Sequence, residues 1–157
     1  MSQYTVRNIQ GVVYGDPVIL ERNAAANVKP GQILELNSSD NFALHSTAGG
    51  QTVPFIALMD FAQGEGVGDQ IDSGEKVFGW VPKRGECGYV RIKLGENFDL
   101  GQHLESDGSG DFQASEGIGD SHGDLGLPVG VALEAIDLDD SAGAFDDNDY
   151  FCLVMFL

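Results

Sequence analysis

The chain has few basic residues, and its second part has none. Its 157 residues include 8 Lys and Arg against 25 Asp and Glu, for a formal net charge of −17. Every basic residue lies at or before Lys93, whereas residues 94–157 hold 15 acidic residues. A strongly negative surface repels nucleic acid and anionic membranes. We therefore expect neither nucleic acid nor a membrane as a partner.

Cysteines, helix-forming segments and long apolar runs are also scarce. Two cysteines, Cys87 and Cys152, are too few for a disulfide framework. Gly and Asp recur every few residues, so only 23–28 and 131–136 look mildly helical. The longest apolar run, 150–157, is too short to cross a bilayer, and no signal peptide is visible. We expect a soluble protein made in the cytoplasm.

What the chain does contain is a series of short β-like runs separated by turn residues. We expect strands at 11–14, 17–20, 32–37, 42–45, 55–60, 76–82, 88–93, 103–106, 111–114, 129–135 and 151–156. This pattern predicts an all-β fold, a compact barrel or sandwich with at most one or two short helices. The last strand is apolar on both faces, which places it in the centre of the fold or against another subunit.

A weak internal duplication runs through these strands. Gly-Gln-Ile-Leu-Glu at 31–35 is echoed by Gly-Gln-His-Leu-Glu at 101–105. A hairpin-turn signal follows each copy, and then a Pro and an apolar run that ends in Ala-Leu. The repeat predicts one scaffold built twice, from approximate units 29–93 and 99–157, within a single β domain at 11–157. Residues 1–10 are expected to form an N-terminal arm.

The sequence offers weak signals for a metal site or a catalytic site. The acidic clusters Asp137–Asp140 and Asp146–Asp149 could supply oxygen ligands to a cation, but solvated loops are the better interpretation. His45, His103 and His122 lack metal-ligand spacing, and no nucleophile elbow accompanies them. We expect no cofactor, no metal and no enzyme activity. A hydrolase or isomerase would need one histidine to meet carboxylates in a pocket.

One basic cluster is a candidate docking surface. It surrounds the tight segment 85–88, and pairing of 77–82 with 88–93 as a hairpin would gather its cations at the tip and along one face. Arg and aromatic residues are enriched at protein interfaces. The cluster either offsets local carboxylates or docks an acidic partner. The candidate interface residues, with one from the arm, are Arg7, Trp80, Lys83, Arg84, Tyr89, Arg91 and Lys93.

The order of short motifs resembles the small head-decoration, or cement, proteins of tailed viruses. The resemblance rests on Gly-Asp-Pro-Val at 15–18, the Pro-Gly turn at 30–31 and Gly-Val-Ala-Leu-Glu-Ala at 130–135. It covers residues 11–157 as a pattern and departs from it in the long acidic loops and the terminal strand. It implies a virion protein on the capsid exterior that clamps the major capsid protein, often as a homotrimer.

The uneven charge has two compatible explanations. Carboxylates keep a protein hydrated at high salt, where screening removes their mutual repulsion, which indicates a salt-loving host. Alternatively, the nearly neutral first half docks and the acidic second half faces solvent. A turret, a fibre base and a carbohydrate-binding β-module remain alternatives to a cement protein.

Overall fold

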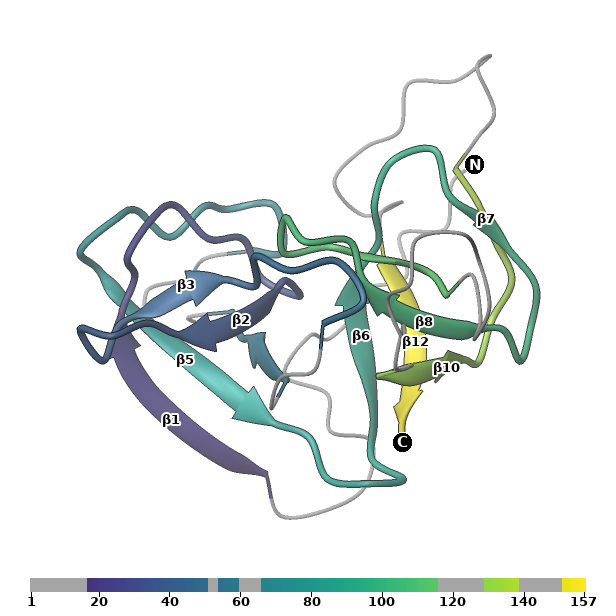
Figure 1. The fold of residues 1–157 in the computed structure, drawn as a ribbon, viewed down its shortest axis with the longest axis horizontal. Helices are drawn as coiled ribbons and strands as arrows, with labels where there is room; N and C mark the ends of the chain where they lie inside the picture. Colours follow the sequence, from purple (N-terminus) through teal and green to yellow (C-terminus); the bar gives the residue numbers. More distant parts are fainter. Residues whose placement is uncertain (1–16, 51–53, 60–65, 116–128, 139–150) are drawn as a thin grey trace.

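The computed structural model describes residues 17–50, 54–59, 66–115, 129–138 and 151–157, and the chain there forms β-strands joined by turns (Figure 1). No helix occurs in these ranges, which confirms the all-β prediction. The strands are β1 Val18–Asn23, β2 Ile33–Leu36, β3 Phe42–Leu44, β4 Phe55–Ala57, β5 Lys76–Val81, β6 Cys87–Arg91, β7 Asn97–Phe98, β8 His103–Ser106, β9 Phe112–Ala114, β10 Gly130–Ala132, β11 Ile136–Asp137 and β12 Phe151–Phe156.

The strands form two five-stranded antiparallel sheets and one small two-stranded sheet. The first sheet has the order β1-β5-β4-β2-β3, the second β6-β12-β10-β8-β9, and β7 pairs with β11. In Figure 1 the first sheet lies on the left and the second on the right. The fold is sandwich-like and is not a closed barrel. In the described part of the chain, no helix is long and apolar enough to cross a membrane.

The two larger sheets repeat a single strand order. β1 to β5 occupy the same places in the first sheet as β6, β8, β9, β10 and β12 occupy in the second. In the first, the residue after the opening strand, Ala24, bridges Phe42; in the second, Ile92 bridges Phe112 in the same way. The strand order sets the repeat boundary between β5 and β6, whereas the sequence units place β6 at the end of the first copy.

The hydrogen bonds of the two Gly-Gln turns also match. The N–H of Gly31 donates to the Ala57 carbonyl oxygen at 2.8 Å, and that of Gly101 donates to Ala132 at 2.8 Å. Both glycines have positive φ, 84° and 89°, which L-residues adopt at a cost. The glutamine after each glycine accepts a bond from the backbone N–H three residues earlier, at 2.8 and 3.3 Å. The shared pentapeptide therefore encodes the same turn twice.

The main core lies between the two sheets. Trp80 of the first sheet meets Phe156 of the second edge to face, with ring centroids 5.2 Å apart. β12 runs between β6 and β10, and Cys152, Val154 and Phe156 point into this core, which confirms a central position for the last strand. A smaller core on the first sheet alone contains Ala24, Val28, Leu34, Phe42, Phe55, Ala57, Ile71 and Val77.

Candidate functional site

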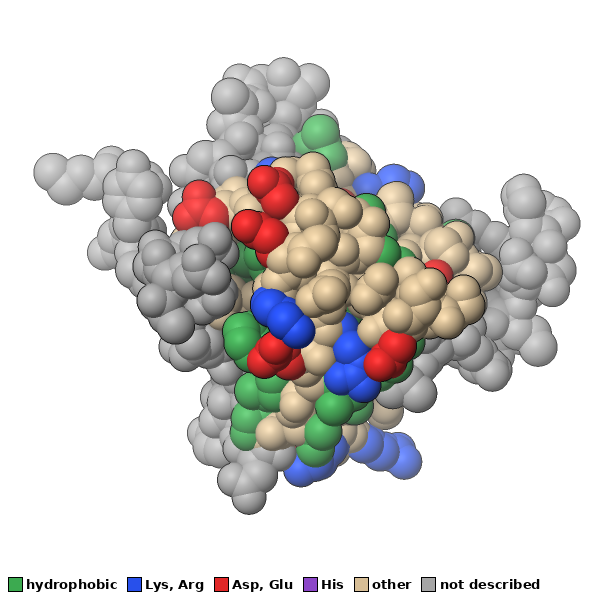
Figure 2. All heavy atoms as spheres, turned by 90° about the vertical axis from the view of Figure 1, so that its left-hand side faces the viewer, with side chains coloured by type: hydrophobic (Ala, Val, Ile, Leu, Met, Phe, Trp, Pro, Cys, Tyr) green, Lys and Arg blue, Asp and Glu red, His purple; other side chains and the backbone are tan. Residues whose placement is uncertain are grey.

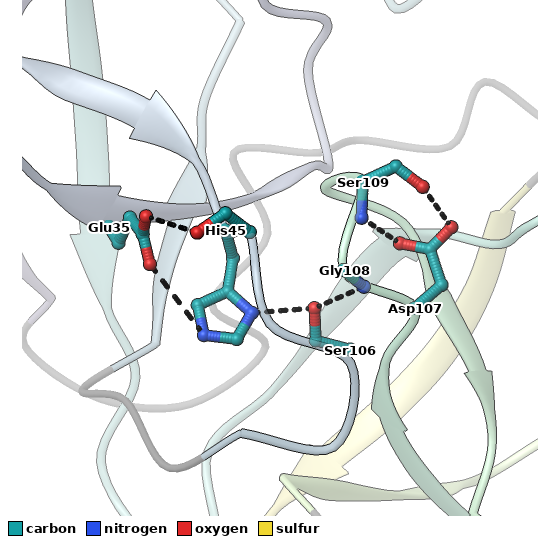
Figure 3. Close-up of polar contacts among 7 residues, drawn as sticks. Glu35, His45, Ser106, Asp107, Gly108 and Ser109 are labelled. Carbon is teal, nitrogen blue, oxygen red and sulfur yellow. Dashed lines mark hydrogen bonds and ion pairs between the residues drawn. The ribbon is translucent and has the colours of Figure 1, made fainter.

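A buried polar contact through His45 joins the two halves of the molecule, the first containing β1 to β5 and the second β6 to β12. This residue follows β3 and is 2% exposed. Its Nδ1 lies 2.7 Å from the hydroxyl of Ser106 at the end of β8, and its Nε2 lies 3.8 Å from the Glu35 carboxylate of β2 (Figure 3). The backbone N–H of Gly108 donates to the same hydroxyl at 3.2 Å. The contact thus ties the β3 end of the first sheet to the β8–β9 turn.

Serine, histidine and a carboxylate are the residue types of a nucleophilic triad. Here Ser106 is 1% exposed, so a substrate atom could reach its hydroxyl only if the two sheets separated. The Glu35–His45 distance of 3.8 Å is long for a hydrogen bond that would orient the imidazole. What this arrangement can do is satisfy buried polar groups where the halves meet. Sequence reasoning missed it because the three residues belong to three different strands or turns.

Other hydrogen bonds between the halves lie close to this contact. The N–H of Ile33 donates to the Gly110 carbonyl oxygen at 2.7 Å, and Gln32 Nε2 donates to the Asp111 carboxylate at 3.0 Å. Burial raises the pKa of Asp111, and the bond from Gln32 opposes that rise without cancelling it. The folded state therefore keeps this proton at pH values where the unfolded chain has lost it, so this group lowers stability as pH rises through that window.

We expect Asp111→Asn to stabilise the protein at pH 7. The neutral side chain avoids the cost of burying a charge, and its oxygen still accepts from Gln32. The gain should be at most about 1 kcal/mol, and it should shrink as pH falls through the raised pKa of the wild-type carboxyl, because the carboxyl becomes neutral there as well. Urea unfolding across this pH range measures it. Asp99→Asn, the same charge change at an exposed site, is the control; a gain equal to that control would contradict the prediction.

The structure divides the basic cluster. β5 and β6 belong to different sheets, so the hairpin that would have gathered its cations does not form. Trp80 is 1% exposed and lies in the core. Arg91 is 5% exposed, lies 4.8 Å from the centroid of the Phe151 ring and donates from Nη2 to the Val67 carbonyl oxygen at 3.0 Å. In this fold neither Trp80 nor Arg91 is accessible to a docking partner.

The remaining candidates lie at separate places. Lys83 and Arg84 are exposed on the β5–β6 turn, which is fixed beside the end of β12 by a 2.8 Å bond from the Gly85 N–H to the Phe156 carbonyl oxygen. Lys93 is exposed after β6 and donates from Nζ to Gln113 at 3.1 Å. Tyr89 is half-buried on β6, and Arg7 lies outside the described residues. The accessible basic pair is thus Lys83 and Arg84.

The described residues contain no group of three or more His, Cys, Asp or Glu that could hold a metal ion. Most of the first acidic cluster, all of the second and His122 lie outside these residues. His103 is exposed on β8. Neither Cys87, which is half-buried, nor Cys152, which is buried, forms a disulfide in the described part of the chain.

These features define a class of fold, a duplicated β unit whose two five-stranded sheets share one core. No protein-family model and no curated protein matches the sequence. A solved structure does share the fold, the N base of head fibre gp8.5 of bacteriophage phi29. The two chains align with a TM-score of 0.53 and 15% identity, over 90% of this chain and 95% of that one. At this identity the likeness establishes the fold.

Proposed function

We propose that the protein is a structural component of a virion that binds the outer surface of the assembled capsid and stabilises it as a homotrimer. The observation that carries the proposal is the fold shared with a phage head-fibre base over nearly the full length of both chains. The sequence resemblance to head-decoration proteins points to the same class independently. Reinforcement would come from buried contact area multiplied over many copies, without chemistry.

Two features of the chain agree with this role. Ser106 and His45 are both buried, so the polar contact between the halves is suited to holding the structure together. The chain has 25 acidic residues against 8 basic ones, which supports an origin in a virus of a salt-rich host, where the carboxylates stay hydrated and their charges are screened. No metal or cofactor enters the proposed mechanism, and enzyme activity is not part of it.

A second candidate is the base of a capsid fibre. It is favoured by the same solved structure, whose description is that of a head-fibre base. Capsid stability separates the two functions. If the protein is a decoration protein, its addition should raise the temperature at which purified capsids break open; if it is a fibre base, it should bind and leave that temperature unchanged. The measurement compares capsids of the same virus with and without the added protein.

The exposed basic turn supplies a test of the docking surface. We expect Arg84→Glu to weaken co-sedimentation with capsids roughly tenfold at low salt and less at molar salt, because salt screens exposed charges. Lys76→Glu is the control, since Lys76 is an exposed base on β5 that pairs with Glu21 at 3.1 Å. Equal binding by wild type and both variants would remove the turn from the docking surface. No binding by any of the three would contradict the capsid role.

A further inference from the structure

One face of the first sheet is buried by the second half of the same chain. Ile33, Ile56 and Trp80 stand side by side across β2, β4 and β5 on this face. None of the three is more than 1% exposed, and all three belong to the core shared with the second sheet. The face is therefore the surface by which the first unit packs on the second. Because the units repeat, the second sheet has an equivalent face.

The equivalent face of the second sheet is partly exposed. His103, Val131 and Met155 stand side by side across β8, β10 and β12 in the same register. His103 is exposed, and Val131 and Met155 are half-buried. Beyond them Leu133 is 36% exposed, whereas its counterpart Leu58 is 7% exposed. Most of this row is apolar, so a face that forms core in one unit forms surface in the other.

The surface of the second unit on which the first-sheet face packs also has an equivalent in the first unit. The second unit receives the first partly through the ends of β6 and β8: the N–H of Arg91 donates to the Gly31 carbonyl oxygen at 2.8 Å, and Ser106 is 1% exposed. The residues that end the matching strands of the first unit are Asn23 and Leu36. Asn23 is exposed and Leu36 is 39% exposed. One chain thus exposes both surfaces of a possible second contact: the face of the second sheet, and the ends of β1 and β2 that would receive such a face.

Charge favours a contact between unlike halves over one between like halves. Residues 82–157, which include the whole second unit, carry 16 acidic and 4 basic residues, so a symmetric contact between two second units would press two acidic surfaces together. Residues 1–81 also carry 4 basic residues but only 9 acidic ones, so the first unit is the less acidic partner. Figure 2, which faces the β1 and β3 side of the molecule, shows apolar side chains there among Lys and Arg side chains and acidic ones.

We propose that the partner on the second-sheet face is a second copy of this chain, whose first unit receives that face through the ends of β1 and β2, as the second unit receives the first-sheet face within the chain. Such a head-to-tail contact uses two different surfaces, and it forms a ring when the rotation from one copy to the next brings the last chain back onto the first. Three copies would place six equivalent units around one ring. The inference deepens the self-association in the proposed function and rests on it, but not on capsid binding.

The test is the molar mass in solution, measured by light scattering at molar salt. We expect wild-type protein at about three times the mass of one chain. Leu133→Glu and Leu36→Glu each damage one of the two surfaces, so each should reduce the mass about threefold, to that of one chain. Leu94→Glu changes a leucine that is 59% exposed and lies on neither surface, so it should keep the wild-type mass. Thermal unfolding confirms that each variant is folded.

Mixing the two damaged variants tests the head-to-tail geometry directly. Each variant keeps one intact surface, and the two intact surfaces match, so an equal mixture should form complexes of two chains. A symmetric contact through the second-sheet face alone predicts that Leu36→Glu keeps the wild-type mass, and that result would overturn the proposal. So would wild-type protein that stays monomeric at all concentrations. A ring that forms but fails to bind capsids would overturn the capsid role and leave this contact standing.

Discussion

Trp80→Ala is expected to lower the free energy of unfolding by about 3–5 kcal/mol, which is the usual cost of deleting a large buried aromatic side chain. Trp80 is 1% exposed and packs edge to face on Phe156 of the opposite sheet. Its loss leaves a cavity at the contact between the halves, where neither sheet can relax without shifting the other. Urea unfolding followed by circular dichroism measures the change.

The internal repeat supplies a matched control for this prediction. Met155 occupies the equivalent position in the second sheet, next to Val131 as Trp80 is next to Ile56. It is half-buried, so Met155→Ala in dilute monomeric protein should cost about 1 kcal/mol or less. Trp80→Phe keeps a ring in the core and should lower the free energy of unfolding by less than Trp80→Ala. It replaces Trp80→Ala in the comparison if that variant fails to fold. If Trp80→Ala and Met155→Ala lowered the free energy of unfolding by similar amounts, Trp80 would not lie in a core between the two sheets.

Gly31→Ala is expected to destabilise the protein by about 2–5 kcal/mol, from two additive causes. The φ of 84° costs an L-residue about 1–2 kcal/mol. In addition, an added Cβ would lie 2.6 Å from Phe151 Cε1 and 3.0 Å from the Arg91 nitrogen, and overpacking of this kind costs about 1–3 kcal/mol. Arg91 cannot easily move, because its N–H donates to Gly31 itself.

Gly101 is the control, because it forms the same turn in the second unit without the close contact. Its φ is 89°, and an added Cβ would meet no atom within 4 Å. Gly101→Ala in dilute monomeric protein should therefore cost only the backbone term, about 1–2 kcal/mol. The difference between the two variants isolates the packing of the Gly31 turn on the second unit. Equal losses for the two glycines would rule out that packing.

Local patterns in the sequence were sufficient to predict many of the strands and turns. Strands 103–106 and 151–156 have the expected bounds, and the Pro-Gly turn has the positive φ that its glycine indicates. Even the duplication is visible, because the Gly-Gln pair makes the same hydrogen bonds in both copies. These features depend on neighbouring residues. β7 and β11, two residues each, are too short to leave a periodic signal.

Features that depend on which sheet a strand joins could not be predicted in the same way. The tight segment at 85–88 has the same sequence signal whether the flanking strands pair with each other or separate, and here β5 and β6 enter different sheets. That choice buries Trp80 and Arg91, two residues that the sequence offers as surface anchors. The His45–Ser106 contact likewise joins residues 61 positions apart. No local spacing encodes such a pair.

The position of β12 also constrains how the chain can fold. The first sheet is complete once residue 81 has been made, because its strands lie between Val18 and Val81. The second sheet opens at β6 but needs β12, which pairs with both β6 and β10, to join its parts. On a ribosome the first sheet can therefore assemble early, while β6 waits for a partner about 60 residues later. Pairing over such separations is slow, so the apolar side chains of the first sheet that the second half covers stay open to solvent, or to a chaperone, until β12 has been made.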